Sequence, residues 1–335
     1  MAGFRIAVAG ATGAVGTEML RVLEKRKFPV REFVALASRR SVGKRLPFAG
    51  GEVEVAELSK DSFEGVDLAL FSAGASRSME FAPAAAAAGA LVVDNSSAFR
   101  MDEGVPLVVP EINPEAIASH KGIIANPNCS TIVMAVAVWP LHRAAGLKRL
   151  VAATYQAVSG TGAAAIDELA EQTRAVQCGK AYPPKVYPYP IAFNLLPHIG
   201  DFAERAYTTE ELKMLYETRK IFGAPELRVS CTTVRVPVFR AHSEALNCEF
   251  ERALTPDEAR RVLAEAPGVE VVDDPKSNRY PMPLDATGRD EVLVGRIRQD
   301  SSVEHGLDLW VSGDQILKGA ALNAVQIAEI ALGKV

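Results

Sequence analysis

The stretch Arg5-Ile6-Ala7-Val8-Ala9-Gly10-Ala11-Thr12-Gly13-Ala14-Val15-Gly16 decides the fold of the N-terminal part of the chain. Residues 5–9 predict a strand, and the glycines follow it at a Gly-x-x-Gly-x-x-Gly spacing. Apolar residues then recur at helical spacing, at Val15, Met19, Val22 and Leu23. A glycine triplet alone indicates only a turn. A strand, a glycine turn and an amphipathic helix together predict a dinucleotide site with the pyrophosphate at the helix N-terminus, contacted by Gly10, Ala11, Thr12, Gly13, Ala14 and Val15.

The second predicted strand, residues 32–37, indicates which dinucleotide binds. It ends in Ser38-Arg39-Arg40-Ser41, where an NAD enzyme usually carries an acidic residue that accepts from the ribose 2′-hydroxyl. Hydroxyl and guanidinium groups suit a 2′-phosphate instead. A solvated basic loop is the alternative, but the position at the ribose end of the site favours NADP over NAD as the cofactor. We expect Ser38, Arg39, Arg40 and Ser41 to contact it.

Composition limits the class of protein. The chain has 335 residues, enough for two domains, with 48% hydrophobic and 23% charged residues. A formal charge of −4 and a pI near 5.9 argue against nucleic-acid binding as the main task. Residues 1–4 show no signal peptide, and no apolar run approaches the roughly 20 residues of a membrane span. We therefore expect a cytosolic (cytoplasmic) protein that contacts no membrane.

Four cysteines and five histidines show no metal-ligand spacing, so no metal is predicted and the thiols are expected to stay reduced. Cys178 is expected at the end of a helix. Cys231 and Cys248 lie in apolar strand segments, where burial raises the thiol pKa.

The order of predicted elements indicates an α/β fold class with two domains. Up to residue 127, short apolar strands alternate with helical segments, as in a mainly parallel sheet, at 68–71, 91–94, 107–109 and 122–125; an alanine-rich helix covers 82–90. Longer β-rich runs follow, at 150–158, 228–240, 244–250, 291–298 and 306–312. Helices at 163–177, 209–221 and 256–265 are expected on one face of this largely antiparallel sheet.

The domain prediction follows from this change of pattern. Residues 1–127 form a Rossmann-like NADP-binding domain, completed by a C-terminal helical segment at 314–335 whose helix covers 314–332. Residues 128–313 form a catalytic α+β domain. Within it, residues 182–190 are too rich in proline for a helix and predict an extended connector.

Asn126-Pro127-Asn128-Cys129-Ser130 carries the strongest chemical signal. It follows a predicted buried strand and precedes an apolar helix at 131–145. A thiol there faces the unpaired N–H groups and the positive end of the helix dipole, which stabilise the thiolate. A lone cysteine is more often an inert core residue, but the neighbouring dinucleotide site makes Cys129 a candidate nucleophile.

The segment Arg235-Val236-Pro237-Val238-Phe239-Arg240-Ala241-His242 lies in the second domain. On one extended strand the side chains of Arg235 and His242 would point to opposite faces, so we expect a bulge or bend near Pro237 to bring both to one site. Sequence alone does not pair His242 with Cys129.

Together these motifs resemble the aspartate-β-semialdehyde dehydrogenase family, in its bacterial branch, over essentially the whole chain. The matching segments keep their order and spacing, and they lie at residues 10–16, 94–100, 126–130, 155–160, 210–213, 235–244 and 319–323. The resemblance implies that NADPH reduces aspartyl-4-phosphate to aspartate semialdehyde and phosphate, on the route to lysine, threonine and methionine. It gives Cys129 the role of nucleophile, His242 that of acid and base, and Gln156 that of orienting the acyl group.

The resemblance also implies substrate contacts. Arg100, Asn128 and Lys213 would bind the phosphate, Arg235 would bind the α-carboxylate, and Glu210 would accept from the α-ammonium. Without the family, Glu210 and Lys213 would be interpreted as a surface ion pair. Segments that the family uses around the cofactor contain Asn95, Ser96, Ser159, Gly160, Gly162 and Asn323.

The resemblance also implies a homodimer formed through the second domain, with a tetramer as the alternative. Two alternatives stay open at this point. One is another acyl-phosphate reductase, such as N-acetylglutamyl-phosphate reductase or a glyceraldehyde-phosphate dehydrogenase. The other is an NADP-binding sensor that lost catalysis.

Overall fold

The computed structural model describes residues 3–333, so residues 1–2 and 334–335, which the predicted first domain includes, lie outside the described residues. The chain forms two compact units, unit 1 with Met1–Asn128 and Ala320–Val335 and unit 2 with Cys129–Gly319. The division falls after residues 128 and 319, whereas the sequence placed it after 127 and 313.

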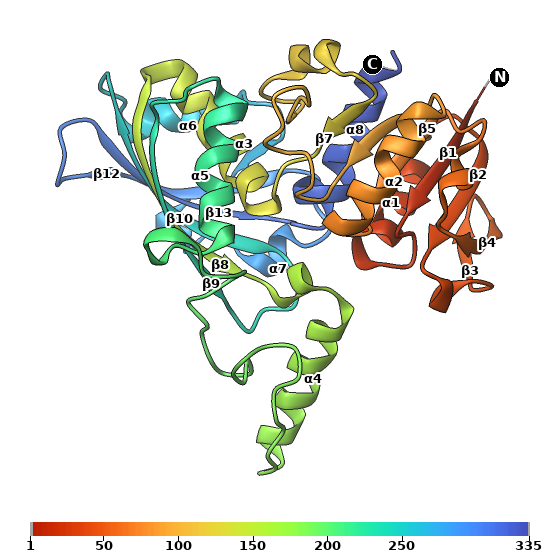
Figure 1. Cartoon of the computed structure of the whole chain (residues 1–335). Coiled ribbons are helices and arrows are strands. Elements are labelled where there is room, and N and C mark those ends of the chain that lie inside the picture. Colours follow the sequence, from red (N-terminus) through yellow and green to blue (C-terminus); the bar gives the residue numbers. More distant parts are fainter. Residues whose placement is uncertain (1–2, 334–335) are drawn as a thin grey trace. The chain divides into compact units, whose positions relative to one another are not determined.

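Unit 1 is built on a seven-stranded sheet in the order β3-β4-β2-β1-β5-β6-β7 (Figure 1). The strands are β1 Phe4–Ala9, β2 Val30–Ala37, β3 Arg45–Phe48, β4 Gly51–Glu57, β5 Leu68–Phe71, β6 Leu91–Asp94 and β7 Ile123–Ala125. All neighbours pair in parallel except β3 and β4, which form an antiparallel hairpin at the edge. The predicted parallel sheet is therefore confirmed, with this hairpin added.

The unit 1 helices are α1 Ala14–Lys25, α2 Ala75–Ala87 and α8 Leu322–Ala331. α1 buries Met19, Val22 and Leu23 of the apolar stripe that the sequence indicated, and its fourth member, Val15, is half-buried. α2 starts seven residues before the predicted alanine-rich segment and contacts β5, β6 and β7, where alanines allow close packing. α8 contacts α1 and β6.

Two predicted elements of the first domain were wrong. Residues 107–109 form a single bridge from Leu107 to Ala125 rather than a strand, because Pro106 and Pro110 remove backbone donors on either side. The C-terminal helix begins later than residue 314. The Asp314 carboxylate accepts from the N–H groups of Ile316 and Leu317 and so caps the helix that follows, which opens with a π-helical turn at Leu317–Ala321.

Unit 2 contains a six-stranded mixed sheet in the order β11-β12-β13-β10-β8-β9. The strands are β8 Leu147–Gln156, β9 Arg228–Arg235, β10 His242–Phe250, β11 Val269–Val271, β12 Val292–Asp300 and β13 Gly306–Gly313. β10 pairs antiparallel with β8 and β13, and β12 pairs antiparallel with β13. The two edge pairs, β8 with β9 and β11 with β12, are parallel.

The helices of unit 2 are α3 Cys129–Ala145, α4 Ala163–Gln177, α5 Thr209–Phe222, α6 Pro256–Ala264 and α7 Pro283–Ala286. α3 contacts β8, β10, β12 and β13 and packs against α5 and α6. Residues 130–138 of α3 are all buried, as expected for an apolar helix that packs on a sheet and against other helices.

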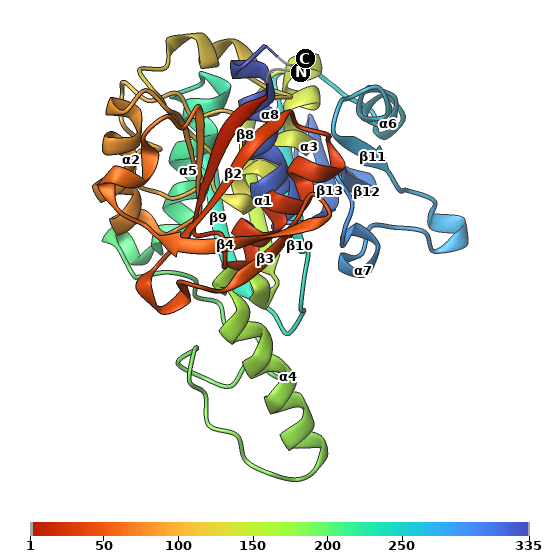
Figure 2. The same ribbon diagram turned by 90° about the vertical axis from the view of Figure 1, so that its right-hand side faces the viewer.

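The prediction that α4 covers the sheet was wrong, since α4 extends away from it (Figure 2). Its buried residues pack against the chain that returns from the helix: Glu168 accepts from the N–H groups of residues 185 and 186, and Gln172 from those of residues 191 and 192. Leu169 joins Val158, Ile191 and Leu196 in a small apolar cluster. The amphipathic pattern of α4 thus serves this local cluster, and residues 182–190 contain no helix or strand, as predicted.

The predicted strand 228–240 was wrong in length. β9 ends at Arg235, and residues 236–241 form a loop in which Pro237 has no N–H to donate and Ala241 adopts a left-handed φ of 69°. Arg235 and His242 therefore end one strand and begin another, and the expected break near Pro237 is a bend in this loop and not a bulge. Among residues 3–333, no helix is long and apolar enough to cross a membrane.

Candidate active site

Three neighbouring strands of unit 2 bring polar side chains to one edge of the sheet. Gln156 ends β8 and pairs with Arg235 at the end of β9, while His242 begins β10, which pairs with β8 on its other side. All three side chains are buried, His242 completely. Parallel β8 and β9 and antiparallel β10 thus place an amide, a guanidinium and an imidazole side by side.

Cys129 is the first residue of α3, the helix that crosses this sheet. Its Sγ lies 3.6 Å from Nε2 of His242. Partial burial of Cys129 contrasts with Cys231 and Cys248, which are buried, and with Cys178, which is exposed and caps the end of α4, as predicted. Burial raises the pKa of the Cys231 and Cys248 thiols, also as predicted. Of the four thiols, Cys129 is the one beside an imidazole.

The imidazole of His242 is fixed from its other side. The backbone N–H of Ala157 donates to Nδ1 at 3.0 Å, and the Ala157 carbonyl accepts from Nη1 of Arg235 at 2.7 Å. Burial, and then the charge of Arg235, hold the pKa of His242 well below its ordinary value of 6.5. The ring is therefore neutral at physiological pH.

Gly160 shows how tightly the backbone approaches this site. A Cβ atom at Gly160 would lie 3.0 Å from Nη1 of Arg235 and 3.3 Å from Nε2 of His242. Only glycine lets the turn after Ala157 pass so close to both side chains.

α5 adds two charged groups to the same edge. Nε2 of Gln156 donates to Oε1 of Glu210 at 3.5 Å, and Nζ of Lys213 lies 3.1 Å from Oε2 of Glu210. Thr208 and Glu211 form a capping box that sets the start of the helix. Glu210 is buried and Lys213 is half-buried, so the pair differs from an ordinary surface ion pair.

A second layer of polar groups lies one step along the same strands. Glu244 is two residues after His242 and pairs directly with Thr154, which is two residues before Gln156. Both are fully buried, and neither the Glu244 carboxyl oxygens nor Thr154 Oγ1 has a hydrogen-bond partner among the described residues. Burial raises the pKa of Glu244 well above its ordinary value of 4.5, because a carboxylate without a hydrogen-bond partner is poorly stabilised there.

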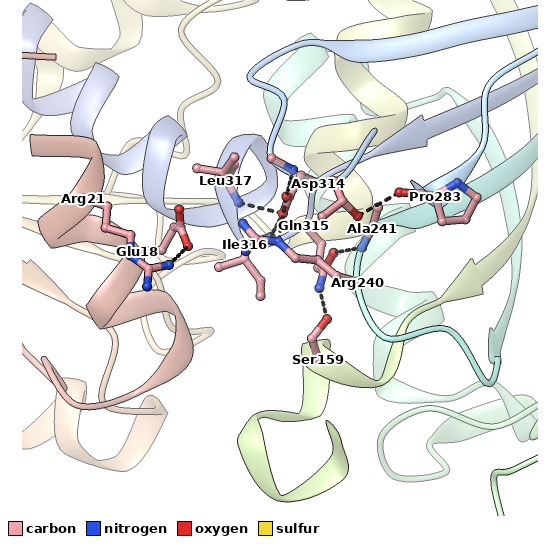
Figure 3. Close-up of polar contacts among 12 residues, drawn as sticks. Glu18, Arg21, Ser159, Arg240, Ala241, Pro283, Asp314, Gln315, Ile316 and Leu317 are labelled. Atoms are coloured by element: carbon pink, nitrogen blue, oxygen red, sulfur yellow. Dashed lines mark hydrogen bonds and ion pairs between the residues drawn. The ribbon is translucent and has the colours of Figure 1, made fainter. Parts of the chain in front are cut away.

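A network that the sequence analysis missed fixes the loops beside His242 (Figure 3). Oε1 of Gln315 accepts from the N–H of Ala241 at 2.8 Å, and Nε2 of Gln315 donates to Ser159 Oγ. Asp314 accepts from Nε of Arg240 at 2.7 Å. The loop before β10 and the turn after β8 are thus tied to one segment. The left-handed backbone conformation of Ala241 has no signal in the sequence, because alanine rarely adopts it.

The remaining site residues of unit 2 lie in the turn after β8. Ser159 is buried and donates its N–H to the carbonyl of Phe239. Gly162 begins α4 with a φ of 106°, which favours glycine.

Unit 1 holds the predicted dinucleotide turn. Gly10 has a φ of 88°, and a Cβ there would lie 2.3 Å from the carbonyl oxygen of Ser72, while a Cβ at Gly16 would lie 2.2 Å from that of Gly10. Gly13 precedes α1, and no side chain caps the first turn of that helix. The uncapped backbone N–H groups at the start of α1 and the glycines without a Cβ atom are the features that a pyrophosphate site needs.

The basic segment lies next to this turn. Ser38 precedes a 3₁₀ turn at Arg39–Ser41, and Ser41 Oγ lies 3.4 Å from Thr12 Oγ1. Arg39 and Arg40 are exposed. Ala11 is buried, and Ala14 and Val15 begin α1. The basic segment thus lies beside the glycine turn through the contact between Ser41 and Thr12.

A buried network in unit 1 contains the other predicted residues. Arg100 donates to the carbonyls of Asn126 at 3.0 Å and Asn95 at 2.9 Å. The Asn126 amide donates to Asn95 Oδ1 and accepts from Asn323, each at 2.7 Å. Ser96 donates to Asp94, and Asn128 is buried. The network anchors the segment that leads directly into Cys129.

Comparison with known proteins identifies the family. Residues 5–120 match the model described as semialdehyde dehydrogenase, NAD binding domain, and residues 138–318 match semialdehyde dehydrogenase, dimerisation domain. The chain is 58% identical over 332 residues to the aspartate-semialdehyde dehydrogenase of Aquifex aeolicus, with 98% of each chain covered. The chain belongs to the aspartate-semialdehyde dehydrogenase family. It is therefore an oxidoreductase that acts on an aldehyde.

Solved structures of the family agree with the fold. Aspartate semialdehyde dehydrogenase II of Vibrio cholerae, complexed with ASA, is 47% identical with a TM-score of 0.97, and 99% of each chain is covered. The Candida albicans enzyme with NADP is 27% identical with a TM-score of 0.78, again with 99% of each chain covered. In residues 3–333 no group of three or more His, Cys, Asp or Glu side chains is arranged to hold a metal ion.

Proposed function

We propose that the chain reduces L-aspartyl-4-phosphate to L-aspartate 4-semialdehyde and phosphate with NADPH, through a thioester on Cys129, in the biosynthesis of lysine, threonine and methionine. The observation that carries this proposal is the 3.6 Å separation between Cys129 Sγ and His242 Nε2 at a helix start. A sulfur in this position is activated by the helix dipole and by a ring nitrogen.

The Cys129 thiolate attacks the acyl carbon, and the carbon–oxygen bond to phosphate breaks to leave the thioester. NADPH, when bound, supplies the hydride that reduces the thioester carbon. The resulting oxyanion then expels the Cys129 thiolate and releases the aldehyde. His242 is placed to transfer a proton to, or form a hydrogen bond with, the sulfur and the thioester oxygen, because its Nε2 is the ring atom beside Sγ.

The substrate's fixed charges match the surrounding side chains of unit 2. Arg235 is a buried guanidinium for the α-carboxylate, and Glu210 is a buried acceptor for the α-ammonium. Lys213, paired with Glu210, supplies positive charge for the phosphate, together with Arg100 and Asn128. Gln156 bonds to Glu210 and orients the acyl group.

NADP is the proposed cofactor. The turn from Gly10 to Val15 would hold the pyrophosphate, and Ser38, Arg39, Arg40 and Ser41 would hold the 2′-phosphate. Asn95, Ser96, Ser159, Gly160, Gly162 and Asn323 complete the proposed cofactor contacts. The Candida albicans relative with NADP supports this choice.

The match of residues 138–318 to a dimerisation domain supports a homodimer formed through unit 2, with a tetramer as the alternative. Sedimentation equilibrium distinguishes these states. A monomer at micromolar concentration would contradict the proposal.

NADPH oxidation with aspartyl phosphate tests the reaction, with N-acetylglutamyl phosphate and 1,3-bisphosphoglycerate as competing substrates. We expect turnover with aspartyl phosphate that releases one phosphate for each NADPH. Turnover only with a competing substrate would assign another acyl-phosphate reductase. NADPH binding without any turnover would assign a sensor.

A further inference from the structure

The hydrogen bond from Ala157 to His242 fixes where the ring can carry a proton. A backbone N–H is always a donor, so Nδ1, 3.0 Å away, must accept with its lone pair. A neutral imidazole then carries its one hydrogen on Nε2, the atom 3.6 Å from Cys129 Sγ.

The surroundings oppose a second proton on the same ring. Protonation at Nδ1 would set two N–H groups against each other at hydrogen-bond distance. Among the described residues, Cys129 on α3 lies beside the ring of His242, and Glu244 follows two residues later on β10. The charge of Arg235 on β9 disfavours an imidazolium. Glu244 is buried without a hydrogen-bond partner and contributes no negative charge while it is protonated.

The peptide group of Ala157 is itself held in place. Its carbonyl accepts from Arg235, and the following residue bonds through its N–H to the carbonyl of Val238. Gln315 then ties Ser159 of this turn to Ala241, the residue before His242 (Figure 3). The donor and the ring are therefore positioned by one rigid set of contacts.

From this geometry we infer that the Ala157 N–H locks His242 as the Nε2–H tautomer, so that the ring serves the reaction as a neutral hydrogen-bond donor to the sulfur and to the substrate oxygen. The inference rests on the proposed function for its catalytic meaning. A neutral imidazole that polarises a carbonyl is an established catalytic device.

The proton count of the proposed reaction closes without a proton passing through the ring. The thiolate forms the carbon–sulfur bond, and the departing phosphate keeps the electron pair of the broken carbon–oxygen bond and takes one proton from solvent. Hydride adds to the thioester carbon and moves an electron pair onto oxygen. Breaking the carbon–sulfur bond then restores both the carbonyl and the thiolate. The Nε2–H group stabilises the oxyanion and the departing sulfur in these steps.

Nitrogen-15 NMR of histidine-labelled protein tests the inference on the resting enzyme, with His242→Asn to assign the signals. We expect His242 to show a protonated Nε2 and an unprotonated Nδ1 throughout the neutral pH range. A proton on Nδ1, or an imidazolium at pH 7, would overturn the inference. Because this readout needs no turnover, it stands or falls separately from the proposed reaction.

Ala157→Pro removes the donor itself. The φ of Ala157 is −63°, which matches proline, and the preceding residue is in an extended strand. Ala157→Ser keeps the N–H and is the control for added side-chain atoms. We expect the proline variant to lose the fixed tautomer, to raise the pKa of His242, to shift the acid limb of its pH–rate profile upward and to lose about tenfold in kcat.

The serine variant should keep the wild-type tautomer and pH profile. A folded proline variant with the wild-type His242 spectrum and pH profile would overturn the inference. If the proline variant fails to fold, the wild-type spectrum alone decides.

Discussion

Gly319 lies against Cys129 so closely that a side chain at Gly319 would meet it: a Cβ there would be 3.0 Å from Cys129 Cβ and 3.3 Å from Cys129 Cα. From the sequence, Gly319 was recognised only as part of the segment 319–323 that matches the family. The contact explains why glycine occupies position 319, because the close approach helps to set the position of Cys129 at the start of α3.

Gly319→Ala should lower kcat by about tenfold or more, since even a small displacement of a reacting group is costly. Gly104→Ala is the matched control, as a Cβ at Gly104 meets nothing within 4 Å. Steady-state kinetics and thermal unfolding of both variants check this. A fully active Gly319→Ala protein would show that the contact does not position Cys129.

Arg40→Asp should weaken NADPH binding by roughly ten- to a hundredfold and NADH binding far less, because a charge-assisted bond contributes about 1.5–3 kcal/mol. Arg40 is exposed beside the turn that approaches Thr12. Lys121→Asp makes the same charge change at another exposed position of unit 1 and should affect neither cofactor. Fluorescence titration measures all four affinities. Equal losses for both cofactors in Arg40→Asp would contradict the assignment.

Lys213→Ala should raise the KM for phosphate in the oxidative direction by about ten- to a hundredfold and leave NADP binding nearly unchanged. Lys213 is half-buried beside Glu210, whereas Lys220 lies two turns later on the same helix. Lys220→Ala is therefore the control. An unchanged phosphate KM would make Lys213 a structural partner of Glu210 only.

Glu244→Gln should stabilise the protein at neutral and alkaline pH. Because burial raises the folded-state pKa of Glu244, the wild-type protein loses stability as pH rises above 4.5 toward that raised pKa. The nearby titratable and charged groups, His242, Cys231 and Arg235, are the same in both proteins. Chemical denaturation from pH 4 to pH 9 checks this, with the exposed Glu226→Gln as control.

The difference in unfolding free energy between Glu244→Gln and wild type should be smallest near pH 4 and should grow with pH. If the unfolding free energies of the two proteins changed with pH in parallel, Glu244 would be ionised in the folded protein.

Elements set by local pattern were predictable. β5, β6 and α4 have the predicted bounds, because apolar runs or stripes are interrupted there by turn-forming residues. Periodicity does not tell which surface a stripe meets, so α4 was assigned to the sheet although Leu169 packs against its own returning chain. The β3–β4 hairpin was missed, because the edge strand β3 has only four residues and contains a proline, and β4 has alternating polar residues that are mostly exposed.

The site was predictable as a list of residues but not as an arrangement. Cys129 and His242 are separated by 113 residues. They meet only because α3, which begins with Cys129, packs on the sheet in which His242 begins β10. Ala157 acts through its backbone N–H and Gly319 through close approach, which leave no chemical signature in a sequence. The side-chain amide of Gln315 joins Ala241 to Ser159, which are far from it in the sequence. Glu244 is a buried acid without a partner, and sequence patterns make an acidic residue look exposed.

The central claim is that Cys129 forms the covalent intermediate. Incubation with aspartyl phosphate in the absence of NADPH, acid quenching and peptide mass spectrometry test it most directly. Cys178→Ser serves as background, because it removes the exposed thiol. We predict one hydroxylamine-labile aspartyl group on the Cys129 peptide, and no adduct and no turnover in Cys129→Ala. Substantial NADPH oxidation by the Cys129→Ala protein, together with no adduct in the Cys178→Ser protein that retains Cys129, would contradict the claim of a covalent intermediate.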